Sequence, residues 1–146
     1  MNGVMDIEKI SITKECQEIL AAYSYYTDHG LYDQQAALFA SDGVYVTPFS
    51  RLEGRVAIRE YLRNKSSKSV VRHVCGIPYF ESIGATEARS VTYVMVIRGG
   101  DDVELPAEVA GMSYVVEFHN IFSLTFEGWR IANHVSKPVL KAGNGQ

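Results

Sequence analysis

The feature of this sequence that most constrains its fold is a change in hydrophobic period near residue 68. Before that point apolar residues recur at the spacing of helices, and after it the pattern is that of strands. The second half contains four long segments rich in β-branched and aromatic residues: Val70–Phe80, Thr86–Arg98, Met112–Phe126 and Trp129–Leu140. Because consecutive strands with short turns pair antiparallel, this order predicts an α+β fold. In it, N-terminal helices pack on one face of a strongly curved antiparallel sheet.

Three helices are expected in the first half. The first carries apolar or aromatic residues at helical intervals: Ile12, Cys16, Ile19, Leu20 and Tyr23. Gly30 ends it, a second short helix runs from about Tyr32 to Phe39, and a third follows Gly54. The stretch Ser41-Asp42-Gly43 predicts a turn before a short strand at Val44–Thr47.

Length and composition indicate one globular domain. The 146 residues, 47% of them hydrophobic, suffice for a single core, so we expect one domain over residues 1–146 with an ordered core from about 11 to 140. The net charge is −3, and the longest basic patch, Arg63–Lys68, fits a solvated helix end, which argues against a nucleic-acid partner. Residues Met1–Ile10 lack a long apolar run, so neither a signal peptide nor a membrane span is expected. These features predict a cytoplasmic protein.

The cysteines and histidines favour neither a disulfide framework nor a metal site. Cys16 and Cys75 are too few for such a framework, and reduced thiols are expected. The four histidines show no short ligand spacing, so we expect no metal and no cofactor. The acidic stretch Gly99–Gly111 is long for a hairpin connection and fits either a lid or a plain surface loop.

Four short motifs occur together in an order typical of one superfamily: ALFASDGVYVTP, LEGRVAIREYL, VVRHV and FEGWRI. Through them the chain from about Cys16 to Pro138 resembles the SnoaL-like branch of the nuclear transport factor two superfamily. The resemblance implies a cone-shaped α+β barrel with an internal cavity, usually paired as a homodimer through the sheet. Activities in the superfamily include polyketide cyclisation, dehydration of ring compounds, ketosteroid isomerisation and epoxide hydrolysis. The fold alone therefore does not assign the chemistry.

A candidate catalytic pair joins the end of the first helix to the first long strand. Alternation places His73 and Cys75 on one face of that strand. The resemblance implies that His73 points into the cavity opposite Asp28 of the first helix. A carboxylate that holds one imidazole nitrogen would leave the other free to act as a general base near neutral pH. The alternatives are a structural histidine and an aspartate that is solvated or caps the following turn.

The third long strand supplies further candidates. Phe118, Asn120 and Phe122 share its more apolar face, where a buried Asn120 could bond its neighbours or orient a substrate oxygen. His119 and His134 are expected on the opposite face of the sheet, at a dimer contact or in solvent.

Comparison within the superfamily assigns expected roles. Similarity to scytalone dehydratase implies that Asp28, His73 and Asn120 surround the substrate as the catalytic set. Two tyrosines are expected to activate a carbonyl, and the substrate-contacting candidates are Tyr25, Tyr45, Cys75, Phe118 and Phe122. The ketosteroid isomerases carry a catalytic Asp where this chain has Thr47, so steroid isomerisation by their mechanism is not expected.

Two functional hypotheses follow. The first is a cofactor-independent acid/base enzyme, a dehydratase, cyclase or isomerase, acting on a small cyclic or polyketide-like substrate. The alternative is a non-catalytic protein that binds a ligand or serves as an accessory subunit, such as the β subunit of a ring-hydroxylating dioxygenase. The expected partners are a small apolar or aromatic ligand and a second copy of the chain.

Overall fold

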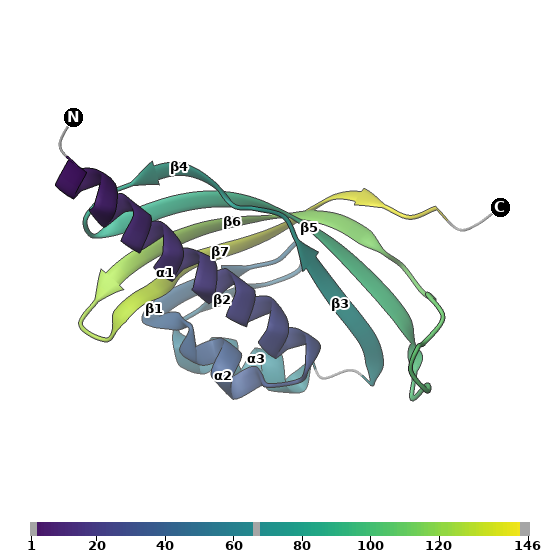
Figure 1. The fold of residues 1–146 in the computed structure, drawn as a ribbon. Helices are drawn as coiled ribbons and strands as arrows, with labels where there is room; N and C mark the ends of the chain where they lie inside the picture. Colours follow the sequence, from purple (N-terminus) through teal and green to yellow (C-terminus); the bar gives the residue numbers. More distant parts are fainter. Residues whose placement is uncertain (1–2, 66–67, 144–146) are drawn as a thin grey trace.

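The computed structural model describes residues 3–65 and 68–143. Within them the chain forms helices α1 (Gly3–Asp28), α2 (Tyr32–Ala37) and α3 (Arg55–Asn64), and strands β1 (Phe39–Val46), β2 (Arg51–Glu53), β3 (Ser69–Cys75), β4 (Tyr79–Ile83), β5 (Glu87–Asp101), β6 (Tyr114–Thr125) and β7 (Gly128–Lys141). The strands make one strongly curved sheet, and the three helices lie under its concave side (Figure 1). The predicted α+β class is confirmed.

The sheet is mixed and open, which corrects two details of the expectation. Its strand order is β2-β1-β7-β6-β5-β3, and β4 pairs with β5. Strands β1 and β7 run parallel, whereas the other described pairs are antiparallel. The chain leaves β1 through β2 and α3 and returns only with β7, so no hairpin forces these two strands to be antiparallel. Among the described strands, the edge strands β2 and β3 do not pair with each other, and no barrel closes.

The segment expected as one strand from Val70 to Phe80 divides into β3 and β4. Residues 76–78 form no strand, and Pro78 has no N–H to contribute to a ladder. Both halves pair with the same edge of β5, β3 with its later residues and β4 with its earlier ones. Strand β2 was not expected, because three residues are too few to show a period.

Helix α1 forms the centre of the core. Ile12, Cys16, Leu20 and Tyr23 recur every three or four residues and are at most 6% exposed. They pack against inward-facing residues of the sheet such as Phe118. No helix in the described ranges is long and apolar enough to cross a membrane.

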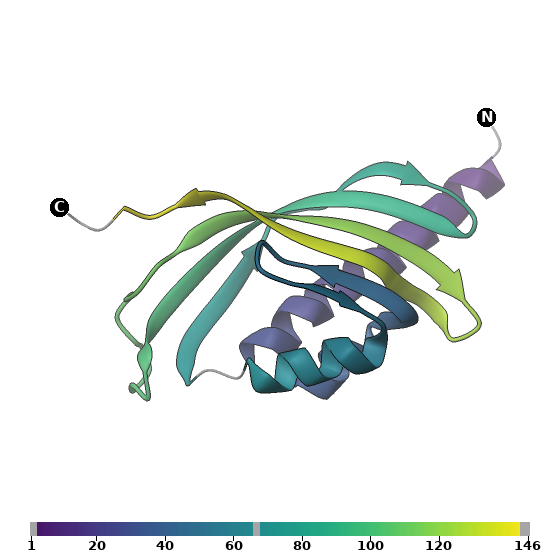
Figure 2. The same ribbon diagram turned by 180° about the vertical axis from the view of Figure 1, so that it is seen from behind.

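Strand β1 begins earlier than expected, because the predicted turn at residues 41–43 lies within it. The register with β7 shifts between Phe39 and Val44, which is the signature of a bulge. A Cβ on Gly43 would lie 3.0 Å from the carbonyl oxygens of Ala40 and Ile131, so only glycine allows this close approach. The bulge brings the end of β1, and the short strand β2 paired with it, beside α3 (Figure 2).

Candidate functional site

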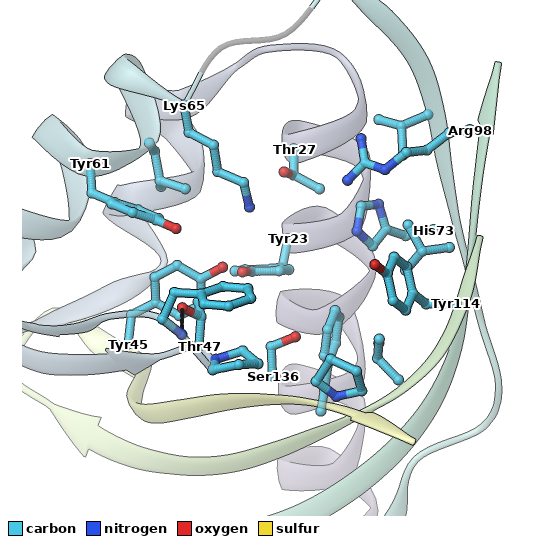
Figure 3. A pocket seen from close by; sticks show the side chains of 18 of the residues that line it. Tyr23, Thr27, Tyr45, Thr47, Tyr61, Lys65, His73, Arg98, Tyr114 and Ser136 are labelled. Carbon is cyan, nitrogen blue, oxygen red and sulfur yellow. Dashed lines mark hydrogen bonds between the residues drawn. The ribbon is translucent and has the colours of Figure 1, made fainter. Parts of the chain in front are cut away.

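A cavity of about 580 Å³ lies between the helices and the concave face of the sheet. Its walls combine aromatic rings, aliphatic side chains and a few polar groups that point inward (Figure 3). The lining residues are Tyr23, Thr27, Tyr32, Tyr45, Thr47, Pro48, Phe49, Tyr61, Leu62, Lys65, Val71, His73, Val96, Arg98, Tyr114, Val116, Phe118, Ser136 and Pro138. The stretch 99–111, considered as a lid, contributes no residue to this lining.

Asp28 and His73 form a hydrogen-bonded pair at the cavity wall. The Nδ1 atom of His73 lies 2.5 Å from Oδ1 of Asp28, and the backbone N–H of His73 donates to Oδ2 at 2.9 Å. The side chain of His73 is only 15% exposed, and that of Asp28 only 5%. Because an ionised carboxylate can only accept hydrogen bonds, the neutral tautomer that fits this contact carries its proton on Nδ1 and has a lone pair on Nε2.

The elements that carry this pair explain its geometry. Asp28 is the last residue of α1, and α1 packs against β3, which carries His73. Alternation along β3 turns Val71 and His73 into the cavity while Arg72 and Val74 are exposed. Because the helix ends opposite the middle of the strand, its final carboxylate bonds both the ring and the backbone of one residue.

Cys75 lies on the same face of β3 but outside the cavity lining. Its Sγ lies 3.0 Å from Oγ of Ser24, one helical turn before Asp28. Burial raises the pKa of the Cys75 thiol, so the thiol stays protonated near neutral pH. Cys75 was expected to contact substrate, but its side chain instead joins β3 to α1.

The tyrosines of α1 divide between the cavity and the surface. Tyr23 lines the cavity, but Tyr25 is 56% exposed and stacks on His29 at 4.2 Å between ring centroids. Two residues rotate about 200° around a helix, which turns Tyr25 away from the face of Tyr23. Tyr25, expected to contact substrate, therefore does not line this cavity.

Tyr23 and Tyr45 form the polar part of the cavity floor. Burial raises the pKa of Tyr23 well above its ordinary value, and the neighbouring Tyr45 raises it further. Burial also raises the pKa of Tyr45. Both phenols therefore remain protonated and can donate hydrogen bonds to an oxygen in the cavity (Figure 3). Phe118, on β6, lines the cavity beside them, as expected.

Asn120 and Phe122 face the helices but lie behind the cavity wall rather than in it. Phe122 is fully buried in the core, and Asn120 is 2% exposed. The Oδ1 atom of Asn120 accepts a hydrogen bond of 2.7 Å from Nδ1 of His134. The ring of His134 lies 4.5 Å from that of Tyr23. Asn120 therefore supports the cavity floor from behind instead of reaching into the cavity.

The position of His134 corrects the expectation that it faces away from the core. In β7, Ile131 pairs with Phe122 and Asn133 with Ile121, so β7 has one extra residue there. This bulge reverses the alternation, and both Ile131 and His134 are fully buried. Burial lowers the pKa of His134 to about 3, which keeps it neutral. His119 lies on the outer face and bonds Glu117 at 2.9 Å.

Two cations at the cavity were not identified from the sequence. Lys65 follows α3 and extends its ammonium group toward the ring of Tyr61, 5.9 Å from the centroid. Arg98 enters from β5 beside His73 (Figure 3). Strict alternation from Val94 and Val96 places Arg98 on the inner face, so the sequence pattern of the strand could have identified Arg98 as a cavity residue. Lys65 had no such signal, since it was expected at a solvated helix end.

The electrostatics of the cavity are dominated by these cations. Burial lowers the pKa of Lys65, and the positive charge of Arg98 lowers it further. Among the described lining residues none is Asp or Glu, and Asp28 lies behind His73. In the described ranges no group of three or more His, Cys, Asp or Glu could hold a metal ion.

Comparisons with known proteins agree with this architecture. The family model of the SnoaL-like domain matches residues 8–135. A search of curated proteins finds no match. Among solved structures, a proposed scytalone dehydratase from Novosphingobium aromaticivorans is 17% identical, with a TM-score of 0.72 over 96% of this chain and 88% of that one.

Two further solved structures share the fold. An NTF2-like protein with a cystatin-like fold from the same organism is 18% identical, with a TM-score of 0.74 over 99% of this chain and 90% of its own. A hexachlorocyclohexane dehydrochlorinase (LinA) of type 2 is 10% identical, with a TM-score of 0.78 over 97% of this chain and 99% of its own. At such identities the similarity concerns the fold alone.

Proposed function

Because the chain belongs to the SnoaL-like family, we propose that it is a lyase or isomerase that works by general acid/base chemistry on a small cyclic or polyketide-like substrate. The observation that carries the proposal is the Asp28–His73 pair, with a 2.5 Å bond and an imidazole that lines the cavity. A cavity of about 580 Å³ with mainly apolar walls suits a small ring compound.

In this mechanism His73 is the base. Its Nε2 takes a proton from the carbon next to a substrate carbonyl, and the electron pair of that C–H bond moves toward the carbonyl oxygen. Asp28 holds the Nδ1–H and stabilises the imidazolium that forms. Tyr23 or Tyr45 donates a hydrogen bond to the enolate oxygen.

The second step returns the proton from His73. In a dehydration, the enolate expels a β-hydroxyl group, which takes this proton and leaves as water. In an isomerisation, the substrate is a β,γ-unsaturated ketone, and the same proton is delivered to the γ-carbon of the dienolate as the double bond moves into conjugation. Both outcomes need only the side chains already named. The names of similar structures, a proposed dehydratase and a dehydrochlorinase, support a lyase among these possibilities.

Asn120 is proposed as a positioning residue in this scheme. It orients His134 by the 2.7 Å hydrogen bond, and His134 packs against the ring of Tyr23. Its substitution should therefore alter the placement of the Tyr23 phenol without removing the base.

Exchange of α-protons for deuterium tests the proposal without knowledge of the natural substrate. Proton NMR in D₂O would follow a panel of small cyclic ketones, including tetralones and β-hydroxy ketones. We expect the wild type to accelerate exchange, and His73→Ala and Asp28→Asn to slow it by about 100-fold or more, because general-base catalysis contributes that much.

The matched control is His119→Ala. His119 also bonds a carboxylate, that of Glu117, but on the outer face of the sheet, so exchange should not change. Circular dichroism would verify that each variant folds. Binding of the ketones with no exchange in the wild type would exclude the enzyme and favour the ligand-binding or accessory-subunit alternative.

We also propose that the protein pairs as a homodimer through the outer face of the sheet. The helices leave that face uncovered (Figure 1). Tyr79, Tyr93 and Met95 are 71%, 68% and 49% exposed there, so several large side chains meet water on one face of the sheet.

A further inference from the structure

The two cations of the cavity have no role in the acid/base mechanism, yet both point into the space where the substrate would bind. Lys65 reaches in from the end of α3 and Arg98 from β5, so two distant elements place positive charges on opposite sides of one cavity (Figure 3). No carboxylate in the described ranges forms an ion pair with either side chain. Burial lowers the pKa of the Lys65 ammonium group, and the positive charge of Arg98 also acts on Lys65 and lowers this pKa further.

Lys65 and Arg98 place positive charge at the cavity, whereas the carboxylate of Asp28 lies behind His73 and does not line it. His73 pairs with Val96 across β3 and β5, and Arg98 is two residues further along β5, which makes Arg98 a diagonal neighbour of His73 on the inner face. A ligand in this cavity therefore meets two cations and no carboxylate among the described lining residues. An anionic group bound between Lys65 and Arg98 would be attracted by both.

We infer that the cavity binds substrates that carry a carboxylate, with Arg98 and Lys65 as the carboxylate-binding residues. The inference rests on the proposed function only in calling the bound molecule a substrate. The guanidinium of Arg98 can donate two parallel hydrogen bonds to a carboxylate. Lys65 adds a second charge from across the cavity, while rings such as Tyr61 contact the apolar body.

A carboxylate fits the site better than a phosphate. Lys65 is the C-cap of α3, so the helix presents its carbonyl end near the site. Phosphate sites in proteins generally use backbone N–H groups at helix N-termini or turns. Two side-chain cations beside the carbonyl end of a helix match a single negative charge.

The experiment compares two probes of the same shape, 2-naphthoate and 2-naphthamide, by isothermal titration calorimetry. In the wild type we expect naphthoate to bind more tightly by about tenfold or more, the difference that a hydrogen bond to a charged group makes. Arg98→Gln and Lys65→Gln should each remove most of this preference and leave naphthamide affinity within about twofold.

Two further variants separate charge from shape. Arg72→Gln removes a cation from β3 that points away from the cavity and should leave both affinities unchanged. Phe49, 95% exposed at the cavity, should contribute apolar contact to both probes, so Phe49→Ala should weaken them equally. Equal affinity for the two probes in the wild type would overturn the inference. So would the failure of both probes to bind at millimolar concentration, or a loss in Arg72→Gln as large as that in Arg98→Gln.

The two experiments separate a failure of the carboxylate site from a failure of the proposed enzyme. His73→Ala should abolish proton exchange but keep the preference for naphthoate, because His73 makes no part of the carboxylate site. A wild type that prefers naphthoate but catalyses no exchange would retain this inference and exclude the enzyme. Exchange of neutral ketones together with equal binding of the two probes would retain the proposed enzyme and exclude the carboxylate site.

Discussion

His73 and His134 lie on neighbouring parts of the same concave face, and their partners give them different properties. His73 has a carboxylate on Nδ1 and lines the cavity. His134 has the neutral amide of Asn120 on Nδ1 and is fully buried, and its Nε2 finds no hydrogen-bond partner among the described residues. A fully buried imidazole with no anion beside it cannot readily become charged. Only the first histidine is suited to move a proton.

The buried His134 should make the stability of the protein depend on pH. Its pKa is about 3 in the folded protein and 6.5 when unperturbed, so the unfolded chain takes up a proton first as the pH falls. The stabilisation is fully present above pH 6.5 and is lost between 6.5 and 3. We expect the free energy of unfolding to fall by up to about 1.4 kcal/mol per pH unit in this window.

Urea denaturation at a series of pH values would measure the effect. Replacing both partners, as in His134→Leu with Asn120→Leu, avoids an orphaned amide and should flatten the pH dependence. The control variant His119→Leu removes an imidazole on the outer face, 39% exposed, and should keep the wild-type slope. An unchanged slope in the double variant would contradict the prediction.

Among the secondary-structure elements, strand β1 connects the cavity to the core. It carries Tyr45, and Thr47 follows directly, so its placement against β7 decides where these cavity residues lie. Arg55 at the start of α3 donates to the carbonyl of Phe39 at 2.9 Å and pairs with Glu127 at 2.6 Å. These contacts connect α3, the beginning of β1 and the β6–β7 turn, while the bulge at Gly43 adjusts the rest of the strand.

Gly43→Ala should destabilise the protein and displace β1. The new Cβ would meet two backbone carbonyl oxygens at 3.0 Å, and neither can move without shifting a strand. Overpacking of this kind costs about 1–3 kcal/mol in free energy of unfolding. Chemical denaturation would measure it, with Gly143→Ala as control because a Cβ there meets nothing within 4 Å. Equal stability of the two variants would show that the β1–β7 contact is looser than described.

At the scale of the whole molecule, the sheet has two unequal faces. The concave face is covered by helices (Figures 1 and 2). The core and the cavity lie between this face and the helices. The outer face contains a shallow depression lined by Ile77, Tyr79, Glu81, Val91, Tyr93, Glu117 and His119. Aromatic side chains on such a face lose unfavourable contact with water when a second copy covers them.

The mass of the protein in solution tests the proposed homodimer. Light scattering after size exclusion should give twice the chain mass of 16.2 kDa for the wild type. Tyr79→Lys with Tyr93→Lys should give the single mass, because lysines cannot be buried unpaired in the interface. Phe126→Lys is the control, since Phe126 is 99% exposed at the β6–β7 turn, away from the patch. A wild type of single mass would exclude the dimer.

The sequence by itself determined the elements and the overall class. The period of apolar residues predicted α1, α3 and the long strands, since both patterns follow from local backbone geometry. Residue types and motif order also led to Asp28 and His73, which the structure brings into contact. These inferences needed only local periodicity and resemblance.

Only the tertiary structure decided which side chains meet at the cavity. The parallel pairing of β1 with β7 and the division of Val70–Phe80 depend on contacts between distant segments. The bulge in β7 turned His134 inward, and the end of α3 directed Lys65 into the cavity that Arg98 also lines. A one-residue bulge reverses every later side chain in a strand, and a long flexible side chain takes its direction from packing. Neither effect is encoded in local periodicity, because both depend on how elements far apart in sequence pack together.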